Sequence, residues 1–198
     1  MNVRVLAVSD EVEPQLLDER TVAGQGRIDL LIGCGDLPAD YLDAMATLYT
    51  APLAFIRGNH DPPRGQGGYP TGAEIDERVV TEKGLLVAGL EGSIRYSSGP
   101  HQYTERQMML KVIRLRIRLR GRHPDILITH GPPAGVNEGT DPPHRGLNAV
   151  RRAVEWTQPR LLLHGHVHPY GRDLVREARL SETRVINVVG HRVIELER

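Results

Sequence analysis

Five short polar blocks, each following a run of apolar residues, carry the side chains that bind metal ions in proteins. These side chains are Asp10, Asp36, Asn59, His60, Asp61, His130, His166 and His168. Carboxylate and amide oxygens together with imidazole nitrogens suit manganese, iron and zinc. Each block alone is weak evidence, because an Asp after a strand usually caps a helix or a turn. The pair His166 and His168 is more specific, since residues two apart on an extended segment face the same side. Five blocks in one chain favour a metal site over coincidence.

The apolar runs that precede these blocks are predicted to be β-strands. Several are apolar at every position, which is typical of strands buried on both faces. The predicted strands are 3–8, 28–32, 53–56, 85–90, 126–129, 161–164, 185–189 and 193–196, and the predicted helices are 14–22, 40–48, 104–119 and 147–156. We expect the last two strands to pair as a closing hairpin. Alternating strands and helices predict a layered α/β fold. The polar blocks should then meet at the carboxyl ends of the strands, where ligands bind in such folds.

Residues 113–120 fit two patterns. Apolar residues alternate with arginines there, which is typical of a strand, but Met108, Val112, Leu115 and Leu119 recur at helical spacing. A helix start near Thr104 favours the helix. We interpret its arginines as a solvated face and not as a stripe that binds nucleic acid.

Composition limits the class of protein. A chain of 198 residues with 39% hydrophobic and 25% charged residues is predicted to form one globular domain, 1–198. Lys+Arg and Asp+Glu balance at 25 each and aromatic residues make up 4%, which argues against a nucleic-acid partner, with the arginine-rich segment 113–120 as the only counter-evidence. Cys34 is the only cysteine, which excludes an internal disulfide. No run approaches the roughly 18 apolar residues of a membrane span, and the start does not resemble a secretory signal. We therefore expect a cytoplasmic protein without a membrane partner. The sequence does not indicate an oligomeric state.

The order of the polar blocks resembles that of the calcineurin-like metallophosphoesterases. The motifs are Gly35-Asp36, Gly58-Asn59-His60-Asp61, His130-Gly131 and Gly165-His166-Val167-His168. The resemblance extends from Asp10 to His168, and residues 89–93, 103–105 and 144–146 resemble a branch of small stand-alone bacterial and archaeal members. It implies a sandwich of two mixed β-sheets flanked by helices, in agreement with the α/β pattern.

The resemblance also implies a role for each polar residue. Asp36 would bridge two divalent metal ions, which could be manganese, iron or zinc. Asn59, His130 and His166 would complete the ligands of one ion, and Asp10 and His168 would bind the other. His60 would protonate the leaving oxygen, with Asp61 holding its ring. The implied activity is hydrolysis of a small phosphodiester or phosphomonoester.

The first block departs from the family pattern. It normally reads Asp-x-His with both residues as ligands, whereas this chain has Asp10-Glu11-Val12, and a valine cannot coordinate a metal. Three outcomes are open: water fills the position, Glu11 or Glu13 supplies an oxygen, or the site binds a single metal. We expect a functional site with a weakly bound first metal, because the other blocks are intact.

Two other functions compete with this one. A nuclease of the same fold would need a basic groove, which the balanced charge does not favour. A non-catalytic, metal-dependent binding or scaffold module with a degenerate first site would have no need of His60. His144, in the Gly- and Pro-rich segment 131–146, could contact substrate or be an ordinary loop histidine.

Overall fold

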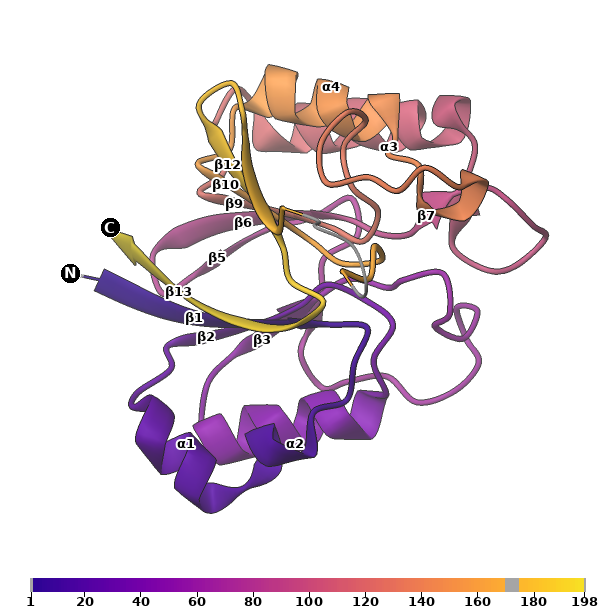
Figure 1. The fold of residues 1–198 in the computed structure, drawn as a ribbon. Helices are drawn as coiled ribbons and strands as arrows, with labels where there is room; N and C mark the ends of the chain where they lie inside the picture. The colour runs from indigo at the N-terminus through magenta and orange to yellow at the C-terminus, as the bar shows by residue number, and fades with distance from the viewer. Residues whose placement is uncertain (1, 170–174, 198) are drawn as a thin grey trace.

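The computed structural model describes residues 2–169 and 175–197 and contains two β-sheets stacked face to face, with helices covering both outer faces (Figure 1). In the first sheet, β1, β2, β3 and β4 are parallel and β13 pairs antiparallel with β1. Its strands, in spatial order, are β13 (Gly190–Glu197), β1 (Asn2–Ser9), β2 (Leu30–Gly33), β3 (Leu53–Phe55) and β4 (Ala73–Glu74).

The second sheet has a parallel centre and antiparallel edges. Its strands, in spatial order, are β11 (Glu177–Leu180), β12 (Thr183–Asn187), β10 (Leu161–His164), β9 (Ile126–Thr129), β6 (Leu85–Leu90) and β5 (Val79–Glu82). The pairs β11–β12 and β5–β6 are antiparallel, and the others are parallel. A separate pair, β7 (Ser93–Ile94) and β8 (Gln102–Tyr103), lies outside both sheets. Both sheets are mixed, so the predicted fold class is confirmed.

Two groups of helices form the outer layers. Figure 1 shows α1 (Glu19–Gln25) and α2 (Ala39–Tyr49) against the first sheet, and α3 (Glu105–Leu119) and α4 (Asn148–Thr157) against the second. Short 3-10 turns occupy Pro14–Leu17 (η1) and Pro142–His144 (η2). No described helix is both long and apolar enough to cross a membrane.

The prediction of one continuous helix over residues 14–22 is wrong. It is split into η1 and α1 at Asp18, whose backbone is extended. The carboxylate of Asp18 accepts hydrogen bonds from the amides of Arg20 and Thr21, and this cap begins a new helix.

The central strands β1, β2, β3, β6, β9 and β10 are largely buried on both faces, as their continuous apolar runs predict. Within β1, Val5 faces the core between the two sheets, while Leu6 faces α1 and α2. In β9, Ile128 packs in the same inter-sheet core and Leu127 faces α3 and α4. The inter-sheet core therefore fixes the two sheets relative to one another.

The predicted hairpin of strands 185–189 and 193–196 is wrong. β12 ends at Asn187 and pairs with β10 and β11, whereas β13 begins at Gly190 and pairs with β1 in the other sheet. The linking residues Val188 and Val189 are buried, so the chain crosses between the sheets through the core instead of turning at the surface. The hairpin partner of β12 is β11, which the sequence pattern did not reveal.

The segment 113–120 belongs to a helix, as predicted. Thr104 and Gln107 form a capping box at the start of α3, and the residues at helical spacing, Met108, Val112, Leu115 and Leu119, are buried. Ile113 and Ile117 are exposed, and so are the intervening arginines. A strand would bury these isoleucines on the same face as Leu115.

Replacing Leu115 with Ala should lower the free energy of unfolding by about 2–5 kcal/mol, because the side chain is fully buried between α3 and the second sheet. Leu110→Ala on the same helix is the control, since Leu110 is 53% exposed. Urea unfolding of both variants measures the difference. Equal losses in the two variants would contradict the placement of α3.

Candidate metal centre

The polar blocks lie at the carboxyl ends of strands from both sheets. Asp10 follows β1 and Asp36 follows β2 in the first sheet, and His166 follows β10 in the second. All three residues adopt the left-handed backbone conformation, with φ of 65°, 58° and 69°. Such conformations are strained for residues other than glycine and cluster at functional sites. The turns direct the side chains away from the strands and toward a shared region.

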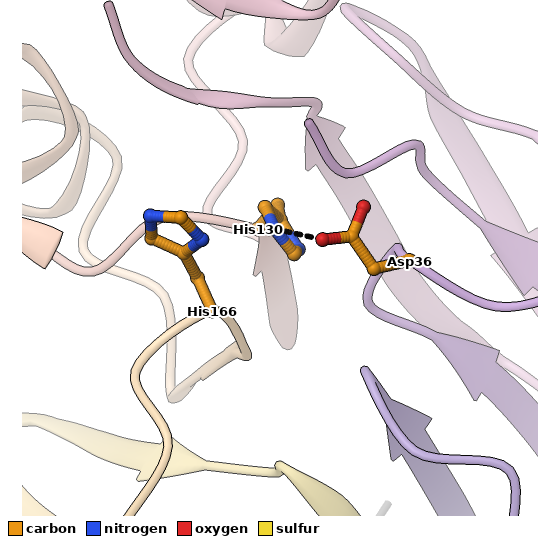
Figure 2. A group of neighbouring side chains, drawn as sticks. All are labelled: Asp36, His130 and His166. Atoms are coloured by element: carbon orange, nitrogen blue, oxygen red, sulfur yellow. Dashed lines mark ion pairs between the residues drawn. The ribbon is translucent and has the colours of Figure 1, made fainter. Parts of the chain in front are cut away.

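Three of the predicted ligands form one compact cluster. Asp36, His130 and His166 each offer a ligand atom, and these atoms lie within 4.8 Å of one another (Figure 2). Asn59 joins the cluster, since its Oδ1 lies 3.0 Å from Nε2 of His130. His130 and Asn59 are buried, and so is His166. A carboxylate, an amide oxygen and two imidazoles at this spacing form a donor set suited to a divalent transition metal.

His130 reaches from the second sheet to the first. Its Nδ1 lies 2.8 Å from the carbonyl oxygen of Cys34, to which it donates, so Nε2 is directed at Asp36, with 3.2 Å between Nε2 and Oδ2. Burial favours a neutral His130 ring, but the Asp36 carboxylate outweighs burial and raises the pKa of His130 to about 9. His130 in turn overcomes the burial of Asp36 and lowers its pKa to about 2. A cation at this position would replace the proton on Nε2.

His166 is held as a neutral imidazole. Burial and the nearby His130 lower the pKa of His166 to about 3. Its Nε2 lies 2.7 Å from the carbonyl oxygen of Pro143, to which it donates. The other ring nitrogen is left as an electron-pair donor, and Figure 2 shows a ring nitrogen turned toward His130. A fixed tautomer of this kind is typical of metal-binding histidines.

Glycines at two positions allow the clustered side chains to approach the backbone. A Cβ on Gly58 would lie 2.1 Å from Oδ1 of Asp36, and a Cβ on Gly165 would lie 2.2 Å from Oδ2 of Asp10. Neither space admits a methyl group. Gly58 and Gly165 therefore allow the carboxylates of Asp36 and Asp10 to pack against the backbone at these positions.

The second group of predicted ligands is less compact. Oδ2 of Asp10 accepts hydrogen bonds from Ser9 Oγ and the amide of His166. Nε2 of His168 lies 3.8 Å from Oδ1 of Asp10, and 42% of the His168 side chain is exposed. Val12, at the position of the usual histidine, is 48% exposed. Among the described residues, the group whose ligand atoms lie within 4.8 Å of one another contains Asp36, His130 and His166, and it does not include Asp10 or His168.

The two candidate substitutes for the missing ligand occupy different places. Oε1 of Glu11 lies 3.4 Å from Nδ1 of His168, whereas Asp10 lies near the other ring nitrogen, Nε2. Oε2 of Glu13 lies 2.8 Å from Nδ1 of His191. Glu11 is therefore placed to orient the His168 ring, and Glu13 points to a different histidine.

The contacts of His60 and Asp61 differ from the expected one, in which Asp61 holds the His60 ring. The His60 amide donates to Oδ1 of Asp36, and its side chain is exposed. The Asp61 carboxylate accepts from the amides of Asp36 and Gly58, at 2.9 and 2.7 Å. Among the described contacts, Asp61 holds the loop backbone instead of the His60 ring. Its catalytic assignment stays a prediction.

A cavity of about 410 Å³ opens over the cluster. It is lined by Asp10, Asp36, His60, Tyr96, Pro143, His144, His166 and His168. The ring centroid of His144 lies 5.1 Å from that of His166, so the loop histidine does reach the site; its role toward substrate stays a prediction. Tyr96, whose hydroxyl accepts from Nδ2 of Asn59, was not predicted, because a lone loop tyrosine carries no sequence signal.

A buried ion-pair cluster lies beside the site and joins two of the motifs named above. Oε1 of Glu91 accepts from Tyr103 Oη at 2.5 Å and lies 3.2 Å from Nδ1 of His101. Burial opposes ionisation of Glu91, but His101, Lys111 and the tyrosine overcome it and lower the pKa of Glu91 to about 2. The adjacent Gly92 amide donates to the carbonyl of Arg57, directly before Gly58. This cluster fixes the loops that carry Asn59 and His130.

Comparison of this chain with known protein families and solved structures agrees with the architecture and the motifs. The model of the calcineurin-like phosphoesterase family matches residues 6–170, so the chain belongs to that family. One crystal structure has a TM-score of 0.71 at 17% identity and covers 100% of this chain and 99% of that chain. That of TT1561 of Thermus thermophilus has a TM-score of 0.70 at 17% identity, covering 96% of this chain and 90% of that chain. At this identity the likeness shows the fold alone. No curated protein matches the sequence significantly.

We expect two manganese-binding events, and Glu11→Gln should weaken the looser one about 10-fold and leave the tighter one unchanged, because a neutral amide orients the His168 ring less well. Isothermal titration calorimetry measures both events. Glu13→Gln removes the same charge near the site but contacts His191, and should leave both events unchanged. Equal weakening in both variants would show that Glu11 acts only through its charge.

Proposed function

We propose that this protein hydrolyses small phosphate esters, monoesters or diesters, with two bound divalent metal ions. Membership of the calcineurin-like phosphoesterase family supports metal-dependent phosphoester chemistry. The observation that carries the proposal is the convergence of Asp36, His130 and His166 from three loops below an open cavity. Manganese, iron or zinc fits this mixture of oxygen and imidazole donors.

The side chains divide into two ligand groups that share Asp36. Asn59, His130 and His166 would complete the tighter site. Asp10 and His168 would hold the other ion, which is the first metal of the family pattern, more weakly because Val12 supplies no donor. Bound ions in such a pair neutralise phosphate charge and activate water.

His60 is the proposed proton donor to the leaving oxygen. Its amide is fixed to Oδ1 of Asp36, while its side chain is exposed and lines the cavity. An imidazole that is anchored through its backbone and exposed at its ring can reach the substrate without competing for a metal. Asp61 supports this placement through the amides of Asp36 and Gly58. His144 is proposed to contact substrate from the opposite loop.

His60→Ala should lower kcat by about 100-fold or more on chromogenic phosphate esters in the presence of manganese, because the leaving oxygen loses its proton donor. Metal content, measured by elemental analysis, should not change. His123→Ala is the matched control, since that exposed histidine contacts the Thr157 carbonyl, outside the candidate centre.

Other results would favour the competing functions. Tight metal binding without turnover on any phosphoester would indicate a non-catalytic binding module. Turnover confined to nucleic acid would indicate a nuclease. Loss of metal in His60→Ala would reassign His60 as a ligand.

A further inference from the structure

A second cavity, of about 520 Å³, adjoins the candidate centre on the side of α2. Apolar residues from β3, from the start of α2 and from the loop after Asp61 form most of its wall. They are Leu37, Pro38, Leu42, Phe55, Pro62 and Pro70. Concave sites of this size with mainly apolar walls are typical of small-molecule binding sites.

The two cavities meet at the proposed proton donor. Asp36 and His60 line both of them. A phosphate ester placed over the metal centre with its leaving oxygen at His60 would therefore direct its organic group either to solvent or into this second cavity.

The charged side chains of Arg57 and Asp61 along the second cavity have protein partners, and the exposed carboxylate of Asp40, which also lines it, accepts from the amide of Tyr41. Nε of Arg57 donates to Glu74 at 3.0 Å, and its Nη1 donates to the carbonyl of Pro62. The Asp61 carboxylate accepts from two backbone amides. Away from Asp40, an occupant would thus meet mainly apolar surface, and a sugar or glycerol group there would lose hydrogen bonds to water without gaining others.

From these contacts we infer that the second cavity binds the leaving group of the substrate and selects esters of compact apolar alcohols, of aryl size. This inference rests on the proposed phosphoesterase function. It names the class of alcohol that the reaction releases and assigns the selection to residues outside the metal centre.

Gly68 offers a way to fill the cavity without touching the metal ligands. It lies in the exposed loop that forms one wall, its φ is outside the left-handed region, and a Cβ there would lie 3.5 Å from Cβ of Ala39 on α2. A leucine at this position would bridge the loop and the helix across the cavity. Gly24, in α1, has open space around its Cβ and provides a matched control.

The test uses manganese-loaded protein and two phosphonates that cannot be hydrolysed, benzylphosphonate and ethylphosphonate, in which a methylene replaces the ester oxygen. Calorimetry should show that the unmodified protein binds benzylphosphonate about 10-fold or more tightly than ethylphosphonate, because a phenyl group is buried. Gly68→Leu should reduce this ratio to about one, and Gly24→Leu should preserve it.

The outcomes separate the two proposals. A ratio near one in the unmodified protein, or a ratio that survives Gly68→Leu, overturns the leaving-group cavity, even if chromogenic esters are hydrolysed. Failure of both phosphonates to bind, together with no turnover of any ester, overturns the phosphoesterase function itself and the cavity with it. Thermal unfolding midpoints of the two variants show whether either substitution disturbs the fold.

Discussion

The contact between Asp36 and His130 is the interaction on which the rest of the site depends. The two residues follow strands of different sheets, and only 3.2 Å separates their charged atoms. His130 also bonds to Cys34 in the first sheet, so one side chain ties both layers together at this edge. That geometry requires the two sheets to be fixed relative to one another, which the inter-sheet core around Val5 and Ile128 achieves. The metal centre is thus a product of core packing as much as of its ligands.

Much of this arrangement was predictable because parallel strands and their ligands leave local signals. Continuous apolar runs marked β2, β9 and β10, and the polar blocks after them marked the edge where Asp36, His130 and His166 meet. Pairing between distant strands leaves no such signal. The apolar link Val188-Val189 predicts a strand both when the chain turns back in the same sheet and when it crosses to the other sheet. Only tertiary packing places β13 in the other sheet. Tyr96 was missed for a similar reason, since its contact with Asn59 depends on how a loop folds.

The two halves of the site differ in how firmly the protein holds them. Asp36, His130 and His166 are fixed by backbone contacts and largely buried, whereas His168 is partly exposed and contacts the side chains of Asp10 and Glu11. A buried, preorganised donor set gives up little freedom when a cation binds, and an exposed one gives up more. We expect both the exposure of His168 and the valine at position 12 to weaken metal binding by Asp10 and His168.

The pairing of β13 with β1 joins opposite ends of the described chain, from Asn2 with Glu197 to Ser9 with Gly190. During synthesis on a ribosome, β1, β2 and β3 leave the exit tunnel long before β13 exists. Throughout that interval β1 is an edge strand with unpaired backbone groups and two apolar faces, a form that invites pairing with other chains. The nascent protein therefore has a particular need of chaperone protection before β13 emerges, although the loops that carry every predicted metal ligand have by then been made.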